Sequence, residues 1–269
     1  MQKHNVIKST VITGARLIVT TIAIMFANFS SVEAADLSVS ANHDRAVTAP
    51  LNKTRHYGNM NGVKIAIPEK YWASVVVQNK TNPSWCQDTS SVNQFKCPIW
   101  AISLDLRYPS FEPIYTQQDL IDWHRNFMRP FDKQDLGQHW LALGYRGDLF
   151  EDIKGNLGAL YRSHLEEATK HFGQLSCNSK YGLLHCVTEK EDGPLRRNEF
   201  FFDDKAKTTL IECTRLSLSH GNYLSCTHYF IVPEIKAIAE IGVNSDKEIS
   251  LWKKLNASVY NITNELIAK

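Results

Sequence analysis

Short alternations of apolar and polar residues predict strands in the first third of the chain. Val63, Ile65 and Ile67 alternate with other residues in GVKIAIP, and the β-branched run WASVVVQ follows Pro68. We expect these two segments to be strands that form a hairpin. A longer alternation in IWAISLDLRY, residues 99–108, places apolar side chains on one face and predicts a half-buried strand.

The spacing becomes helical after residue 115. The segment that begins at Thr116 and stops before Pro130 carries its apolar residues at helical spacing, namely Leu120, Ile121, Trp123, Phe127 and Met128. It predicts a short amphipathic helix, and residues 139–147 predict a further strand. Residues 157–172 fit either a helix or irregular structure, because the glycines at 155, 158 and 173 weaken a helical assignment.

The second half has the clearest pattern. Four apolar or aromatic runs follow Leu175, separated by turn residues, and a fifth follows Pro233: LLHCVTE, EFFFDD, TLIECTRLS, YLSCTHYFIV and IKAIAEIGV. They predict an antiparallel meander. From about Lys247 the spacing changes to three and four, at Trp252, Leu255, Val259, Ile262 and Leu266. The predicted fold class is therefore α+β, with a mainly antiparallel sheet and a packed C-terminal amphipathic helix. We expect disulfides to staple this fold.

The N-terminal segment predicts export. Basic residues at positions 3, 8 and 16 precede the apolar stretch 17–29, and Val32-Glu33-Ala34 offers small residues where a signal peptidase cleaves. We expect residues 1–34 to be a signal peptide cleaved near Ala34 and the mature protein to be periplasmic. The alternative, a retained membrane anchor, is disfavoured because a spanning helix needs roughly 20 apolar residues.

The predicted cleavage near Ala34 sets the first domain boundary. Residues 35–58 are polar and aperiodic and predict a flexible leader, and residues 59–269 predict an α+β domain that could divide into two sub-domains near 131–138. Removing three of the 30 basic residues and one of the 28 acidic residues with the signal leaves 27 of each. The balance, with no run of five like charges, argues against a nucleic-acid partner and against an anionic membrane surface.

The six cysteines fall into three local pairs, Cys86 with Cys97, Cys177 with Cys186, and Cys213 with Cys226. Each pair encloses about ten residues that include turn residues, so we expect three sequential disulfides among the fifteen pairings that six cysteines allow. A zinc site is disfavoured because it needs shorter ligand spacing.

Catalytic motifs are missing from the sequence. It has no Gly-x-Ser-x-Gly, no phosphate-binding loop and no dinucleotide-binding glycine motif. His164 and His171 flank Glu167, but their spacing does not fit the metalloprotease pattern, and we interpret them as solvated or core-edge histidines. We therefore predict no catalytic residue, metal or cofactor, although an active site assembled from distant residues remains an alternative.

Predicted turns supply candidate binding residues. Trp85, the turn from Tyr108 to Phe111, and the pair Arg196 and Arg197 are each placed where a side chain could enter a partner's concave surface. The plainer interpretation makes Arg107 a salt-bridged residue at a sheet edge and residues 189–199 a solvated hairpin tip.

Five segments carry a resemblance: NGVKIAIP, DLRYPSFEP, YGLLHC, YLSCTHYFIVPEIKAIAEIG and LWKKLNASVYNIT. They resemble exported bacterial proteins encoded beside toxin genes, the periplasmic immunity proteins of type VI secretion effectors, lipase effectors among them. The resemblance spans most of residues 60–265. Its motifs are structural, so it assigns no binding residue.

The resemblance implies a protein partner, the cognate toxin. Together with export and the missing catalytic motifs, it leads us to expect a non-enzymatic protein that occludes the active site of an antibacterial toxin. Two alternatives stay open at this point, an exported hydrolase with an unrecognised active site and a ligand-binding module of the cell envelope. The sequence does not identify the toxin.

Overall fold

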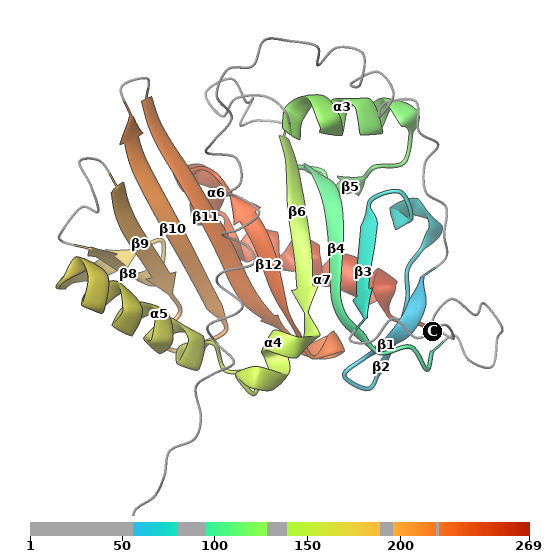
Figure 1. The fold of residues 1–269 in the computed structure, drawn as a ribbon, viewed down its shortest axis with the longest axis horizontal. Coiled ribbons are helices and arrows are strands. Elements are labelled where there is room, and N and C mark those ends of the chain that lie inside the picture. The colour runs from blue at the N-terminus through green and yellow to red at the C-terminus, as the bar shows by residue number, and fades with distance from the viewer. Residues whose placement is uncertain (1–55, 80–94, 128–138, 189–195, 219–220) are drawn as a thin grey trace, which may run out of the picture. The chain divides into compact units, whose positions relative to one another are not determined.

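The computed structural model describes residues 56–79, 95–127, 139–188, 196–218 and 221–269, all of which belong to one compact unit that begins at residue 49. The described residues form an α+β fold with a large antiparallel sheet, as predicted (Figure 1). The predicted signal peptide, nearly all of the leader, Cys86 and Trp85 lie outside these ranges. The first strand, β1 (Tyr57–Met60), begins just before the predicted end of the leader.

A ten-stranded sheet dominates the described part of the chain, and each of its pairings is antiparallel. Its strand order is β3 (Val75–Asn79), β4 (Ile99–Tyr108), β6 (His139–Arg146), β12 (Ala237–Val243), β11 (Gly221–Val232), β10 (Thr209–Leu218), β9 (Arg196–Phe202), β8 (Leu183–Thr188) and β7 (Leu175–Lys180), with β5 (Glu112–Pro113) beside β4. Strands β4 and β6 flank residues 131–138 and pair over eight positions, so one continuous sheet spans the proposed sub-domain boundary.

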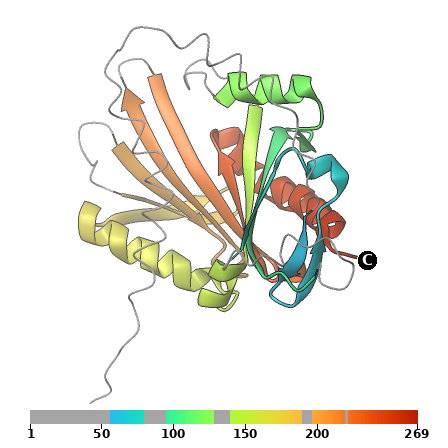
Figure 2. The same cartoon turned by 45° about the vertical axis from the view of Figure 1, so that its right-hand side comes forward.

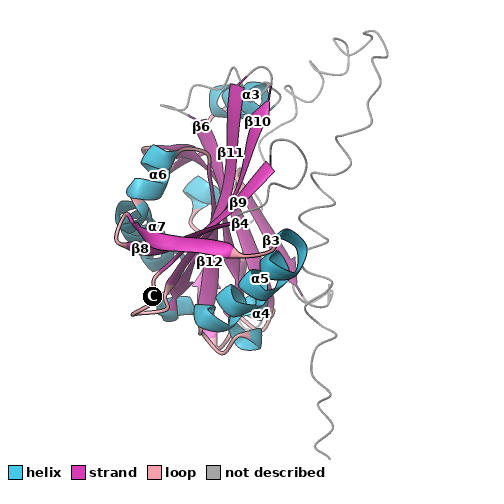
Figure 3. Cartoon of the chain, turned by 90° about the vertical axis from the view of Figure 1, so that its left-hand side faces the viewer, coloured by secondary structure: helices cyan, strands magenta, loops and turns pink. Residues whose placement is uncertain are grey.

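Helices cover both faces of the sheet (Figure 3). One face carries α6 (Asp246–Ser250) and α7 (Trp252–Leu266), and the other carries α4 (Gly147–Asp152) and α5 (Leu157–Phe172). A further helix, α3 (Gln117–Phe127), lies at one end of strand β6, where the sequence predicts it. Short 3-10 helices occur at Glu69–Tyr71 and Pro233–Ile235.

Three consecutive phenylalanines in β9 show how this arrangement makes two cores. Phe200 and Phe202 pack with Leu157 and Tyr161 of α5, and Phe201 belongs to the larger core beneath α7. Successive side chains of a strand point to opposite faces, so a strand covered on both faces is apolar at consecutive positions. The run FFF within EFFF is therefore apolar at consecutive positions because β9 is buried on both faces of the sheet.

The C-terminal helical segment is split. The predicted helix from Lys247 onward is two helices, α6 and α7, separated at Leu251. In α7 the predicted positions Leu255, Val259, Ile262 and Leu266 are buried, as expected for a helix that packs on a sheet. Trp252 is only partly buried, and its indole N–H donates to the Tyr181 carbonyl at 3.1 Å.

The predicted N-terminal hairpin was wrong in its pairing. The segment around Val63–Ala66 is a strand, β2, but it pairs with β1 and forms a separate two-stranded sheet. The connecting Asn61-Gly62 has positive φ at both residues, 50° and 90°, which is the turn that an Asn-Gly pair favours. The run around Val75 became β3, whose partner is β4.

Two of the predicted disulfides are present across neighbouring strands. Cys177–Cys186 joins β7 to β8, and Cys213–Cys226 joins β10 to β11. The first lies toward α5, since the Tyr161 hydroxyl is 3.4 Å from the Cys186 sulfur, and the second lies in the core under α7. Cys97 is also disulfide-bonded. The pairing of Cys97 with Cys86 stays a prediction.

Candidate functional site

Between α3 at one end and α4 and α5 at the other, the face of the sheet opposite α7 carries no helix among the described residues (Figure 2). We call this region the open face and define it by positions that alternate outward on five neighbouring strands: Ser103, Asp105, Ala142, Gly144, Arg146, Glu240, Gly242, Thr227, Tyr229 and Glu212. The antiparallel register sets these positions side by side in cross-strand rows. Asp105 pairs with Ala142, and Gly242, Thr227 and Glu212 follow one another across three strands. A second row runs Ser103, Gly144, Glu240 and Tyr229.

Helix α3 borders the open face through ion pairs. The guanidinium of Arg107 lies 2.9 Å from Asp119 and 3.4 Å from Asp122, and it stacks 4.8 Å from the Trp140 ring. Burial alone would raise the pKa of Asp119, but hydrogen bonds from Thr116 and Tyr115 and the charge of Arg107 lower it. The predicted salt bridge of Arg107 is therefore present, although β4 is an inner strand and not a sheet edge.

Helix α5 borders the opposite side through apolar packing and one histidine. Its N-cap is Asn156, whose side chain accepts from the Gly158 N–H at 2.9 Å, and the Tyr161 ring stacks on Phe202 at 4.1 Å. His164 Nδ1 lies 2.9 Å from Glu212 of β10. Burial disfavours the charged ring, but the hydrogen bond and charge of Glu212 raise the pKa of His164. His171, by contrast, pairs with Glu167 on the exposed side of the same helix.

The floor of the open face is made of small residues. Gly242 and Ala142 are exposed, and a Cβ added to Gly242 would meet no atom within 4 Å. At Gly144 an added Cβ would meet the side chain of Glu240 at 3.6 Å. Glycine inside a strand contributes no side-chain packing, and it commonly marks a close approach of another group. The floor is thus lined by small residues, with exposed backbone at Gly242.

Two carboxylates, those of Glu240 and Asp105, lie beside this floor, and nearby groups offset their negative charge only in part. The Glu240 carboxylate lies 3.8 Å from Arg146, whereas Arg146 donates to Asp148 at 2.9 and 2.7 Å. Burial raises the pKa of Glu240 to about 6, against the opposing charge of Arg146. Burial likewise raises the pKa of Asp105 to about 6, although a hydrogen bond from Trp123 of α3 acts in the other direction.

Tyr229 also lies on the open face, where two carboxylates affect its ionisation. Burial raises the pKa of its hydroxyl well above the usual range, and the charges of Glu240 and Glu212 add to the effect. Its phenol stays neutral, so the open face offers carboxylate acceptors together with the hydroxyl groups of Ser103, Thr227 and Tyr229.

The predicted binding residues do not lie together on this face. Tyr108 and Phe111 pack against each other and against the core under α7, so neither ring projects freely from its turn. The Tyr108 ring also stacks on buried His139, which is 3.2 Å from Glu248 of α6. Arg196 and Arg197 begin β9, and Arg197 is exposed. Their roles in binding stay predictions.

A second polar cluster lies on the α7 side and serves the fold. Glu199 Oε2 is 3.2 Å from His185, and its Oε1 accepts from Arg215 at 2.7 Å. Arg215 also reaches Asp246 at 3.1 Å. Burial opposes ionisation of Glu199, but hydrogen bonds from His185 and Arg215 lower its pKa to about 2. These pairs tie strands β8, β9 and β10 to the start of α6.

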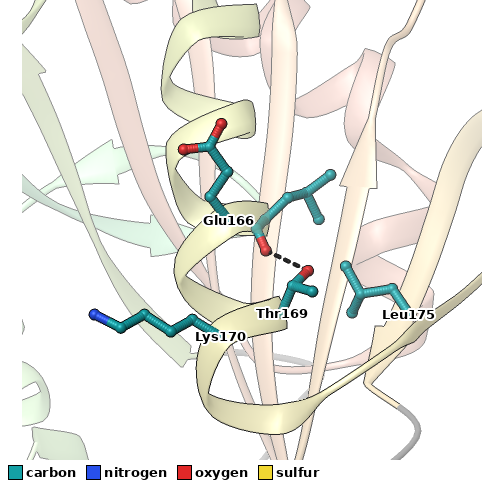
Figure 4. A pocket seen from close by; sticks show the side chains of 5 residues that line it. Glu166, Thr169, Lys170 and Leu175 are labelled. Carbon is teal, nitrogen blue, oxygen red and sulfur yellow. Dashed lines mark hydrogen bonds between the residues drawn. The ribbon is translucent and has the colours of Figure 1, made fainter.

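A hollow of about 450 Å³ lies where α5 turns into β7 (Figure 4). Leu165, Glu166, Thr169, Lys170 and Leu175 line it. The Thr169 hydroxyl donates to the Leu165 carbonyl at 2.7 Å, and the charged ends of Glu166 and Lys170 point away from Leu175. This hollow lacks converging reactive groups. Across the described ranges, no group of three or more His, Cys, Asp or Glu side chains is arranged to hold a metal ion.

The open face could not be recognised in the sequence. Each of its residues sits among apolar neighbours in a strand, and only the strand register brings Asp105 of β4 near Ala142 and Gly242. The available signal was a glycine within two strand patterns, at 144 and 242, which often marks close approach.

The fold and the open face define a disulfide-stapled α+β domain with a shallow, polar, acidic sheet surface. Among the described helices, none combines the length and apolar character needed to cross a membrane. No protein-family model and no curated protein sequence matches the chain. The chain is structurally similar to Smlt3025, an immunity protein of the Stenotrophomonas maltophilia type IV secretion system, with a TM-score of 0.43 and 11% identity over 81% of this chain and 94% of that one.

Proposed function

We propose that this protein is an exported immunity protein that binds a cognate antibacterial toxin and occludes its active site. The sequence resemblance supports a type VI secretion effector as the toxin, a lipase effector among the candidates. The basic and apolar N-terminal segment supports export to the periplasm. The two cross-strand disulfides fit an oxidising compartment.

The observation that carries the proposal is the kind of site that the fold presents. The open face is a shallow polar surface on paired strands, with Gly242 exposed at its floor. Small-molecule and catalytic sites are usually concave cavities with converging groups. Protein partners bind broad surfaces of about 800 Å² per side, and rigid strands keep such a surface ready for binding.

A binding mechanism makes protection stoichiometric. An occluding protein inhibits one toxin molecule per bound copy, whereas an enzyme that destroyed the toxin or its product would act in substoichiometric amounts. The predicted contact residues Trp85, Tyr108, Phe111, Arg196 and Arg197 are further positions to test by substitution, beside the open face.

The proposal predicts protection of cells that make the toxin in the periplasm. The experiment expresses the toxin encoded by an adjacent gene, directed to the periplasm, with and without this protein. We expect growth to be restored, and restored only when residues 1–34 are present, because an immunity protein left in the cytosol cannot meet the toxin.

Titration of purified protein against toxin activity supplies the second measurement. We expect complete inhibition near a one-to-one ratio. Failure to bind any neighbouring gene product, or turnover of a small substrate by the purified protein, would exclude the immunity function and favour the hydrolase alternative.

A further inference from the structure

The open face presents negative charge that the described residues neutralise only in part. Arg146, the arginine of this face, is engaged by both oxygens of Asp148. Within the described part of the chain no hydrogen bond reaches the Glu240 carboxylate, whose side chain is only 15% exposed. Its nearest cation, Arg146, is 3.8 Å away and is shared with Asp148, and a buried carboxylate with so weak a partner is unfavourable.

The geometry leaves room for a cation at this point. Glu240 leans over Gly144, and Gly242 beside it is exposed and has no neighbour where a Cβ would sit. Asp105 stands two strands away, across Ala142 and roughly 10 Å from β12 by ordinary strand spacing. A basic side chain of a partner that lay along this floor would sit between the two strands that carry these carboxylates.

We propose that the open face is the toxin-binding surface, and that it receives an arginine or lysine side chain of the toxin between Glu240 and Asp105. This inference rests on the proposed function and assigns it a surface and a partner chemistry. Charge complementarity favours a basic protein segment as the occupant. Arginine suits the site well, because its planar donors can bind a carboxylate through two hydrogen bonds while its stem packs on the glycine floor.

A steric test uses one position with two substitutions. Gly242→Arg places a large basic side chain on the floor, and Gly242→Ser adds a hydroxyl group where space is available. The probe is the purified toxin encoded by the adjacent gene, and the readout is its dissociation constant by calorimetry. We expect Gly242→Arg to weaken binding by at least about 30-fold, the scale of a central interface residue, and Gly242→Ser to stay within about threefold.

Two further variants serve as controls for the steric test. Ala257→Arg introduces the same charge on the exposed side of α7, far from the open face, and should leave the dissociation constant within about threefold. Ala142→Arg probes the floor from the neighbouring strand if Gly242→Arg lowers the thermal midpoint.

A charge test separates binding from folding. Glu240→Gln and Asp105→Asn should each weaken binding by about tenfold while keeping or raising the thermal midpoint at pH 7.5, because burial disfavours the ionised forms. Residues that served only to hold the fold would lower the midpoint when replaced. Loss of stability without loss of binding would therefore overturn the inference.

Binding should also weaken in acid. Glu240 faces Arg146 of β6, Asp148 of α4 and Tyr229 of β11, and Asp105 faces Trp123 of α3. A basic partner binds the ionised carboxylates, so affinity should fall by about tenfold between pH 7.5 and 5.5, since each group has a pKa of about 6. The double variant Asp105→Asn, Glu240→Gln should lose this dependence.

The outcomes distinguish the two proposals. If the wild-type protein binds the toxin and Gly242→Arg binds equally well, the surface assignment fails and the immunity function stands. An equal loss with Ala257→Arg would also overturn the assignment. If the wild-type protein does not bind, both the function and the surface assignment fail.

Discussion

His228 is a histidine held entirely inside the core. It lies on β11 with no solvent exposure, next to the ring of Phe230 at 5.1 Å, and neither ring nitrogen has a hydrogen-bond partner among the residues that the structure describes. Burial lowers the pKa of His228 to about 3. The ring is therefore neutral at pH 7.

This residue should make the protein sensitive to acid. The unfolded chain binds a proton at His228 below about pH 6.5 and the folded chain does not, so stability falls as the pH drops from 6.5 toward 3. We expect His228→Leu to be more stable than wild type, with an advantage that grows by roughly 1 kcal/mol per pH unit below 6.5. Urea unfolding of both proteins at pH 7.5 and 4.5 measures it, and an advantage independent of pH would show that His228 titrates normally.

The carboxylates of the open face change the pH dependence of stability in the opposite direction. Because burial raises the pKa values of Asp105 and Glu240, the folded state binds more protons than the unfolded state between about pH 4 and 6, and these groups reduce stability at neutral pH. Comparing His228→Leu with wild type at each pH removes their effect. A charge kept at some cost in stability is common in residues that serve binding or catalysis.

Among the elements, α7 packs on the larger of the two cores. Its stripe of Leu255, Val259, Ile262 and Leu266 faces the sheet, and Thr263 within the same stripe donates to the Val259 carbonyl at 2.8 Å. The Tyr260 hydroxyl donates to the Ile231 carbonyl at 2.8 Å and fixes the helix against β11. The stripe follows the helical period, so the stability contributed by each residue should depend on its face.

Substitutions on the two faces of α7 test this. Leu266→Ala removes a fully buried side chain and should cost about 2–5 kcal/mol of unfolding free energy. The control Asn261→Ala, on the exposed face, should change it by less than about 0.5 kcal/mol. Denaturant unfolding measures both. A loss below about 1 kcal/mol for Leu266→Ala would mean that α7 is not packed on the sheet.

Individual elements were predictable from the sequence, but their partners were only partly so. The alternation in β4 and the helical spacing in α7 report burial of one face, which is a local property of the chain. The pairing of β2 with β1 depended on the Asn61-Gly62 turn, and the wrong hairpin came from treating Pro68 as the turn. The open face could not be predicted, because its residues meet only through the register of strands distant in sequence.

At the scale of the whole molecule, the two described disulfides staple opposite faces of one sheet. Cys213 and Cys226 are buried under α7, whereas Cys177 is exposed on the edge strand β7. Each closes a short hairpin and would stabilise the folded state by about 3 kcal/mol in the chain-entropy description. Accessibility to a reductant should differ accordingly.

Peptide mapping without reductant should find three disulfides, Cys86–Cys97, Cys177–Cys186 and Cys213–Cys226, with no free thiol. Mild reduction under native conditions should open Cys177–Cys186 before Cys213–Cys226, because thiolate attack needs access to the sulfur. Alkylation and mass spectrometry at successive times measure the order. A cross-link between the three groups, or reduction in the reverse order, would contradict the prediction.

The position of β12 has a consequence for how the chain is made. This strand lies between β6 and β11, and it is the only one in the described sheet that joins strands made early to those made later. Until residue 243 has been synthesised, the growing chain holds two separate half-sheets with unpaired inner edges. The described sheet is therefore completed only when β12, the last of its strands along the chain, has been made. For a chain exported as we propose, this order would keep the precursor loosely folded until β12 had emerged, and passage through a narrow translocation channel requires that state.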